Sequence, residues 1–322
     1  MNGFSPIDHA ARVSTIRSLL AGGELGVDAL LFTDLLDVRW LTGFTGSNGW
    51  VVLRAERAVL GTDTRYGERA TAETDGSGVE IVAIRDRGAL HGALVDSAGP
   101  GTVGLDARSA THAQWKQLGA DLSLASVDSI VGTAREVKDA AEVERIAAAA
   151  AAADAALSEV EPLLFATLDA PVTEADVRDE LEYRMRRHGA DDRSYDTIVA
   201  SGPDHAARPH HEVARRTIIE GDTVVIDVGA LVDGYHSDMT RSYVIGEPTA
   251  QQREVYDLVQ ASQTAGLDAL RPGVTAASVD SVCRDVFAAA GYGEWYLHGT
   301  GHGVGLQIHE SPFHSQASNE VI

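Results

Sequence analysis

The chain has 322 residues, 44% hydrophobic and 23% charged, a length and composition that suit about two ordinary globular domains. Its 48 acidic and 26 basic side chains give a formal net charge of −22, which would repel nucleic acid and an anionic membrane surface. The single cysteine, Cys283, excludes a disulfide framework and a thiolate zinc site. With no signal pattern and no apolar stretch of roughly 20 residues, we expect a cytoplasmic protein with no nucleic-acid or membrane partner.

The first third of the chain alternates short apolar runs with amphipathic stretches. Strands are predicted at 27–32, 49–53, 58–62, 79–83 and 102–106, and helices at 8–21, 64–74, 86–97 and 109–118. The charged residues 54–57 separate two of the apolar runs and predict a hairpin. This alternation predicts an α/β N-terminal domain with a mixed sheet, which we assign to residues 1–132.

The pattern changes near residue 128, and residues 128–133 are predicted to be a linker. A long helix is expected over Glu142–Val160, because it contains seven consecutive alanines and alanine has the highest helix propensity. A second helix is expected from Thr173 to His188, with Thr173 and Asp176 able to cap it.

Strands and helices of the second half follow in separate groups. Strands are predicted at 195–200, 216–230 and 239–245, and helices at 250–270 and 275–290. This order favours an α+β domain with antiparallel hairpins, which we assign to residues 133–322. The domain carries no glycine-rich phosphate-binding motif, so nucleotide binding is unsupported.

Two aspartates stand out in the second domain. Asp227 lies inside an apolar strand, where a carboxylate is costly unless it is paired or bound to a cation. A turn at 231–234 follows, so Asp238 is expected to begin the returning strand and to reach the same face of the sheet. The alternative is a buried Asp227 that pairs with Arg241.

Histidines are concentrated between residues 205 and 314. They are His205, His210, His211, His236, His298, His302, His309 and His314. Alternate glycines surround His302, which lets the backbone approach an ion or a substrate closely. His302 and His309 are seven residues apart, so a bend must lie between them if both face one site. Carboxylates with an imidazole suit Mn²⁺, Co²⁺ or Zn²⁺.

Together these motifs resemble the pita-bread metallopeptidases. The resemblance rests on Asp-x-Gly at 227–229, Ser-Asp-x-Thr-Arg at 237–241, His-Gly-x-Gly-His-Gly-x-Gly at 298–305 and His-Glu-x-Pro at 309–312. Within this family the chain is similar to Xaa-Pro dipeptidases (prolidases) and Xaa-Pro aminopeptidases. Residues 42–47 and 62–66 resemble a creatinase-type N-terminal domain, and 135–138 with Glu142 resemble the start of the catalytic domain.

The resemblance implies a pita-bread fold with a curved antiparallel sheet and a role for each matching residue. Asp227 would bind one metal ion, Asp238 would bridge two, and His302 would bind the other. His309 would contact the scissile carbonyl and move a proton, while His210 and His298 would line the substrate pocket. Two divalent ions are therefore implied, Mn²⁺ first, with Co²⁺ or Zn²⁺ as alternatives.

The implied function is a metal-dependent exopeptidase that hydrolyses Xaa-Pro bonds in short peptides by a metal-activated water. Its partner would be a proline-containing dipeptide or oligopeptide, and the family resemblance implies a homodimer. Whether the enzyme is a dipeptidase or an aminopeptidase stays open. The other interpretations are a creatinase-like amidinohydrolase and a catalytically inactive binding module of the same fold.

The family also uses two glutamates that this sequence does not match before Ile322; neither Glu310 nor Glu320 fits either one. Two divalent charges would be poorly neutralised by Asp227, Asp238 and His302 alone. We therefore expect the chain as given, with the C-terminal part of its catalytic domain missing, to bind metal weakly or at one site and to have little or no peptidase activity.

Overall fold

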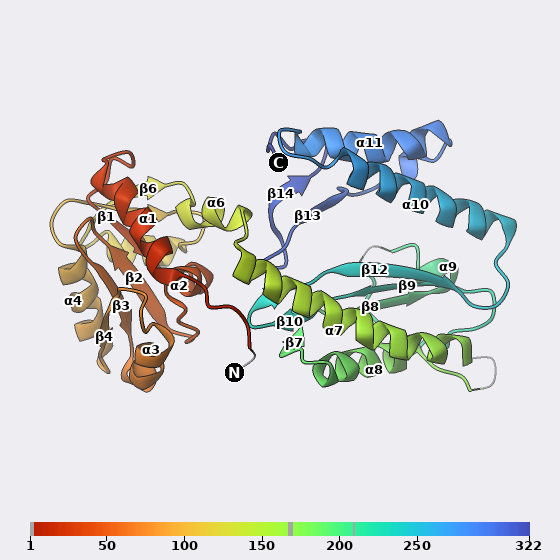
Figure 1. Ribbon diagram of the computed structural model, residues 1–322, viewed down its shortest axis with the longest axis horizontal. Coiled ribbons are helices and arrows are strands. Elements are labelled where there is room, and N and C mark those ends of the chain that lie inside the picture. The colour runs from red at the N-terminus through yellow and green to blue at the C-terminus, as the bar shows by residue number, and fades with distance from the viewer. Residues whose placement is uncertain (1–2, 167–169, 209) are drawn as a thin grey trace. The chain divides into compact units, whose positions relative to one another are not determined.

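The computed structural model describes residues 3–166, 170–208 and 210–322 (Figure 1). The chain divides into two compact units, one of Ser5–Val137 and one of Met1–Phe4 with Lys138–Ile322. Across the described residues, no helix has both the length and the apolar character needed to cross a bilayer.

The unit Ser5–Val137 is built on a mixed sheet, as the sequence predicts, but the sheet has six strands, one of which, at Ser123–Val127, is not predicted from the sequence. In spatial order its strands are β4 (Glu80–Ala83), β3 (Ala58–Thr62), β2 (Gly49–Leu53), β1 (Ala29–Phe32), β5 (Thr102–Asp106) and β6 (Ser123–Val127). β1 and β3 both pair antiparallel with β2, and the other pairs are parallel. β1 and β3 are buried along their whole length, so the centre of the sheet lies in the core of this unit.

Helices and short turns connect these strands. They are α1 (His9–Ala21), α2 (Leu35–Thr42), the 3₁₀ turn η1 (Thr64–Tyr66), α3 (Gly67–Glu73), α4 (Arg87–Ala98), α5 (His112–Leu118) and α6 (Ile130–Glu136). The predicted linker at 128–133 is wrong, because α6 begins inside it. Ser129 caps this helix by accepting a hydrogen bond from Gly132 N, and Val131 is buried.

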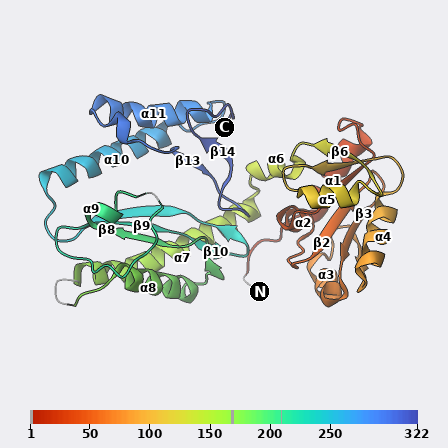
Figure 2. The same cartoon turned by 180° about the vertical axis from the view of Figure 1, so that it is seen from behind.

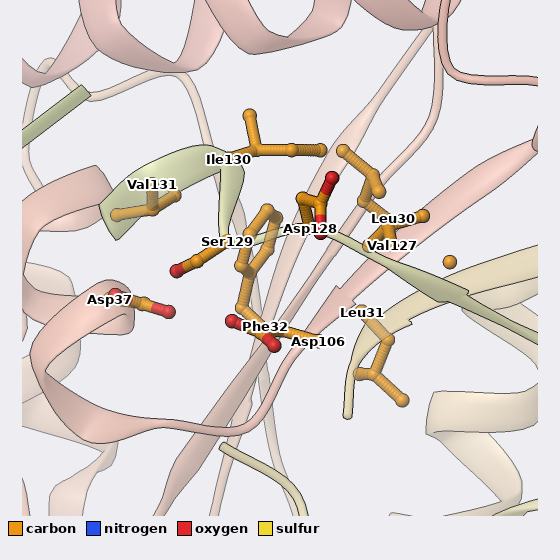
Figure 3. A pocket seen from close by; sticks show the side chains of 11 residues that line it. Leu30, Leu31, Phe32, Asp37, Asp106, Val127, Asp128, Ser129, Ile130 and Val131 are labelled. Atoms are coloured by element: carbon orange, nitrogen blue, oxygen red, sulfur yellow. The ribbon is translucent and has the colours of Figure 1, made fainter. Parts of the chain in front are cut away.

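A buried ion pair connects α6 with α2 inside this unit. Arg135 Nη1 lies 3.1 Å from Asp37 Oδ1. Burial and the neighbouring charge of Asp34 nonetheless raise the pKa of Asp37 to about 6. The cavity beside Asp37, lined also by Phe32 and Ser129, has a volume of about 10 Å³, room for one water at most (Figure 3). We therefore assign no ligand to it.

The second unit begins with two capped helices. α7 (Ala140–Phe165) extends past the predicted 142–160 at both ends, and α8 (Glu174–Arg187) carries the expected capping box between Thr173 and Asp176. The buried face of α7 contains Ala149, Ala152, Ala153 and Ala156. These small side chains form one core cluster with side chains of α8 and of strand β9.

Every strand pair in this unit is antiparallel, so the α+β prediction is confirmed. One sheet has the order β12 (Met239–Val244), β9 (Thr223–Val228), β8 (Ile198–Ser201), and the other has the order β11 (Tyr235–His236), β10 (Ala230–Val232), β7 (Asp192–Arg193). A hairpin of β13 (Gly301–Gly303) and β14 (Glu310–His314) completes the strands described in this unit.

The predicted single strand at 216–230 is wrong, because the chain changes sheets at Gly229. β9 pairs with β8 and β12 up to Val228, whereas β10 pairs with β7 and β11 from Ala230 onward. A Cβ at Gly229 would lie 2.0 Å from the carbonyl oxygen of Ser237. Only glycine allows the two segments to approach so closely, and this crossing follows directly on the strand that carries Asp227.

The remaining helices are α9 (Gly202–His205), α10 (Ala250–Ala269), α11 (Ala276–Ala289) and the 3₁₀ turn η3 (Gly293–Trp295). Figures 1 and 2 show α10 and α11 side by side, with the β13–β14 hairpin beside α11. Residues Glu320–Ile322 hydrogen-bond to the turn that precedes α11.

Candidate metal centre

Asp227 and Asp238 lie on one face of the β9–β12 ladder. Asp227 is paired in register with Thr240, and Asp238 precedes Thr240 by two residues, so the two carboxylates point to the same side. Asp238 comes immediately before β12 rather than within it. The structure thus brings together the two aspartates that the sequence singles out.

Tyr195 connects the two carboxylates. Its hydroxyl oxygen lies 2.6 Å from Oδ1 of Asp227 and 2.8 Å from Oδ1 of Asp238, so its single proton is shared between two acceptors. The sequence analysis missed Tyr195, because no spacing relates residue 195 to residues 227 and 238. Only the pairing of β8 with β9, in which Ile198 lies opposite Asp227, brings this segment close.

Burial and the repulsion between the two carboxylates determine the pKa shifts of Asp227 and Tyr195. Burial raises the pKa of the half-buried Asp227, the charge of Asp238 adds to the effect, and the Tyr195 hydrogen bond and the nearby His210 oppose it. Burial and the two carboxylates raise the pKa of Tyr195 well above its ordinary value. Tyr195 therefore stays a neutral donor, held where a cation would be attracted by both carboxylates.

His302 completes the group from the β13–β14 hairpin. Its Nε2 lies 3.4 Å from Asp238 Oδ2, and its Nδ1 lies 3.0 Å from the carbonyl oxygen of Gly303. When Nδ1 carries the proton and donates it to that carbonyl, Nε2 is left with a free lone pair. The ring nitrogen that faces the carboxylates is then the one able to bind a metal ion.

His309 lies beside His302, as a bend between them requires. Their ring centroids are 4.4 Å apart at an interplanar angle of 69°, and residues 305–309 form the bend that joins β13 to β14. The His309 side chain is exposed. It can therefore reach both the neighbouring imidazole and a molecule that arrives from solvent.

His210 and His298 differ in how close they lie to the aspartates. His210 is exposed on the loop after α9 and is close enough to act on the carboxyl of Asp227. His298 is also exposed, with Nδ1 2.8 Å from the Gly299 carbonyl oxygen and its ring against Tyr296. Within the described part of the chain, no hydrogen bond or ion pair joins His298 to the aspartates.

Two charged residues near the candidate motifs in the sequence, Arg241 and Glu310, have other partners. Arg241 donates to the carbonyl of Thr240 and lies 3.8 Å from Asp154, so the alternative in which it pairs with Asp227 is wrong. Glu310 is buried and lies 2.9 Å from Lys138 Nζ.

This arrangement fits a divalent cation. Two carboxylates of like charge converge on one hydroxyl, and an imidazole nitrogen approaches one of them from a third segment. The shared Tyr195 proton, a hydrogen bond from Thr240 and the nearby His210 all favour the charged form of Asp227, and a cation would do so more strongly. Oxygen-rich sites with one imidazole suit Mn²⁺, Co²⁺ and Zn²⁺.

Comparison with known families matches a family to each half of the chain. The model of metallopeptidase family M24 matches residues 144–322, and the model of the creatinase/prolidase N-terminal domain matches residues 12–137. An uncharacterized peptidase, YqhT of Bacillus subtilis (strain 168), is 36% identical over 317 residues, which is 97% of this chain and 87% of that protein.

Two solved structures share both units of the fold. An Xaa-Pro dipeptidase from Bacillus anthracis superposes with a TM-score of 0.89 at 32% identity, over 98% of this chain and 87% of that one. An X-Pro aminopeptidase from Thermotoga maritima superposes with a TM-score of 0.83 at 31% identity, over 94% of this chain and 86% of that one.

Proposed function

The chain belongs to metallopeptidase family M24, and from this premise we propose that it is a metal-dependent exopeptidase that cleaves Xaa-Pro bonds in short peptides. The observation that carries the proposal is the convergence of Asp227 and Asp238 on the Tyr195 hydroxyl, with His302 beside Asp238. The names of the two similar structures, a dipeptidase and an aminopeptidase that both act at Xaa-Pro, support this substrate class.

Each residue has a defined task in this proposal. Asp227, Asp238 and His302 would be ligands of two divalent cations in the complete catalytic domain, Mn²⁺ in preference to Co²⁺ or Zn²⁺. When bound, such cations supply Lewis-acid activation of water at neutral pH. Tyr195 stays protonated and orients the two carboxylates by hydrogen bonding.

The histidines act on the substrate. His309, exposed and in contact with His302, donates to the scissile carbonyl oxygen and carries a proton at its imidazole. His210 and His298 present exposed rings that would contact the peptide. Proline lacks an N–H and has a fixed φ, so its recognition relies on side chains of this kind rather than on an extended backbone ladder.

The test is hydrolysis of Xaa-Pro, Xaa-Pro-Yaa and Xaa-Ala peptides by the purified protein with Mn²⁺, before and after exhaustive chelation. For a protein that carries the complete catalytic domain we expect cleavage of at least one proline substrate, loss on chelation and recovery with added metal. Asp227→Asn should abolish the activity, and Asp96→Asn, at an exposed position in the other unit, should not. Activity that survives metal-free dialysis would contradict the proposal.

Two further measurements on the same protein, creatine hydrolysis and peptide binding, separate the other interpretations. Release of urea from creatine, with no peptide cleaved and no metal required, would indicate a creatinase-like amidinohydrolase. Peptide binding without turnover in the metal-loaded protein would indicate an inactive binding module. The homodimer and the cytoplasmic location stay predictions; light scattering at micromolar concentration tests the dimer, and a monomer mass would refute it.

A further inference from the structure

A second group of metal-ligating side chains lies apart from the aspartates. Its members are Glu174, the first residue of α8; His205, the last residue of α9; and His211, on the loop that follows. One ligand atom from each lies within 4.8 Å of the others. Three segments that are separate in the sequence therefore direct ligand atoms to one place.

The two imidazoles approach the same carboxylate. His205 Nδ1 lies 2.9 Å from Glu174 Oε1, and His211 Nε2 lies 3.1 Å from Oε2. The two rings are stacked with centroids 4.0 Å apart and an interplanar angle of 28°. The Glu174 side chain is fully buried, while 22% of the His205 side chain is exposed, so the group has a closed side and an open side.

These distances are near those of a tetrahedral zinc site. Zinc binds imidazole nitrogen at about 2.0–2.1 Å and carboxylate oxygen at about 2.0–2.2 Å, so neighbouring ligand atoms lie about 3.3 Å apart. The two nitrogens lie 2.9 and 3.1 Å from different oxygens of the Glu174 carboxylate. A cation between the two imidazoles would therefore be bound by both oxygens, or by one of them after a small rotation of the carboxylate. A water on the open side of His205 would supply the fourth ligand.

Backbone and hydroxyl donors hold the carboxylate in place. Glu174 Oε1 accepts from Ser201 N and Oγ at 2.7 and 2.8 Å, and Oε2 accepts from Ala214 N at 3.1 Å. Burial pushes the pKa of Glu174 upward, but the hydrogen bonds from His205, Ser201 and His211 outweigh it and hold the pKa below its ordinary value. The carboxylate is thus ionised and oriented, as outer-shell partners do for metal ligands.

We propose that Glu174, His205 and His211 bind a zinc-like divalent cation at a site separate from Asp227, Asp238 and His302. Such a cation would connect the start of α8 to α9 and to the loop that carries His211. His210 is next to His211 in the chain, so the cation would also restrict the position of a residue that faces Asp227. The binding itself does not depend on the proposed peptidase activity.

The experiment removes the first centre and looks for the second. In the full chain carrying Asp227→Asn and Asp238→Asn, Zn²⁺ is titrated against a chromophoric chelator. We expect one equivalent of zinc to remain bound. Adding His205→Gln and His211→Gln should weaken its binding by at least about 100-fold, because loss of an outer-shell partner alone costs about 10–100-fold and these variants remove two direct ligands.

A matched control uses two other histidines that also lie 2.9 Å from a carboxylate. His188 pairs with Glu159 and His91 with Asp121, and each of these carboxylates is at least 41% exposed. His188→Gln with His91→Gln, in the same background, should leave zinc binding unchanged. Equal loss in both pairs of variants would show that the substitutions act on folding or on surface charge.

Two results would overturn the proposal. One is no zinc bound in the Asp227→Asn/Asp238→Asn protein, which would leave Glu174 as a hydrogen-bonded clamp on the loop. The other is zinc binding that persists without His205 and His211. If the multiple variant does not fold, Co²⁺ is added to the Asp227→Asn/Asp238→Asn protein instead; the visible absorption of a tetrahedral nitrogen–oxygen site supports the proposal, and its absence contradicts it.

Discussion

The imidazoles of His302 and His309 meet edge to face at an interplanar angle of 69°, with ring centroids 4.4 Å apart, although their positions are seven residues apart in the chain. His302 Nε2 lies 3.4 Å from Asp238 Oδ2, whereas among the described residues His309 forms no ion pair with a carboxylate, and its side chain is exposed. Two rings in contact are thus suited to different tasks, one as a metal ligand and one as a proton carrier.

Substitution of these two histidines should separate metal content from turnover. We expect His309→Ala to lower kcat by about 10²–10⁴-fold with metal content kept, the usual range for loss of a proton-transfer group. His302→Ala should instead lower the metal content, because its Nε2 is the ring nitrogen that faces Asp238. Metal analysis and steady-state kinetics measure both quantities, with His112→Ala, at an exposed surface position, as the control. Equal metal loss in the two variants would refute the division of roles.

Tyr195→Phe should weaken metal binding without removing a ligand. The hydroxyl donates to both Asp227 and Asp238, and outer-shell donors of this kind contribute about 10–100-fold to metal affinity or activity. Titration calorimetry with Mn²⁺ measures the change, and Tyr183→Phe, at an exposed tyrosine, serves as the control. Unchanged affinity and activity would mean that the two carboxylates need no shared donor.

Gly229→Ala should destabilise the unit that contains the candidate metal centre. The new Cβ would lie 2.0 Å from the Ser237 carbonyl oxygen and 2.9 Å from Ser194 Cβ, so the two sheets must separate locally. We expect a loss of at least about 1–3 kcal/mol, the usual effect of overpacking. Gly301→Ala is the matched control, because its Cβ would meet nothing within 4 Å. Thermal melts of the two variants should therefore differ; equal melting temperatures would refute the crossing argument.

Asp37 should give the Ser5–Val137 unit a distinct dependence on pH. Its folded-state pKa of about 6 is above the ordinary value of 3.8, so its contribution to stability is fully present below pH 3.8 and is lost as pH rises through 6. The loss amounts to about 3 kcal/mol between these limits.

Denaturant unfolding of the wild type and Asp37→Asn tests this directly. The unfolding free energy of the wild type, relative to the variant, should fall as pH rises from 4 to 7. As a control, Asp75→Asn, at an exposed position, should still show the same decrease in unfolding free energy between pH 4 and 7 as the wild type. A carboxyl titration of Asp37 with its midpoint near 4 would show that burial does not dominate at this position.

The sequence predicts the order of elements well wherever the pattern is local. Alternating apolar runs place five of the six strands of the mixed sheet within about two residues and miss β6, and the capping pair Thr173 and Asp176 marks the start of α8. Prediction from the sequence fails where tertiary contacts determine which element forms. Nothing local shows that Gly229 divides one apolar run between two sheets, or that Arg135 pairs with Asp37 and fixes a helix in a predicted linker.

Some residues of the candidate site can likewise be predicted from the sequence, and others cannot. Asp227, Asp238, His302 and His309 are visible in the sequence because unusual residues recur in short motifs, and the structure places them together. Tyr195 and the pairing of Glu174 with two histidines leave no such trace. Their partners lie 31 to 43 residues away and are brought close only by strand pairing and loop closure.

Phe4 lies under the guanidinium of Arg145, 5.1 Å from ring centroid to Cζ, and packs against the core of the second unit. The polypeptide therefore passes between the units twice, after residue 4 and after residue 137. A single proteolytic cut near residue 137 would leave the first fragment docked to the second through its own leading residues. A recombinant piece that begins at Lys138 would lose a core side chain encoded more than 130 codons upstream, so clean separation of the units requires two cuts.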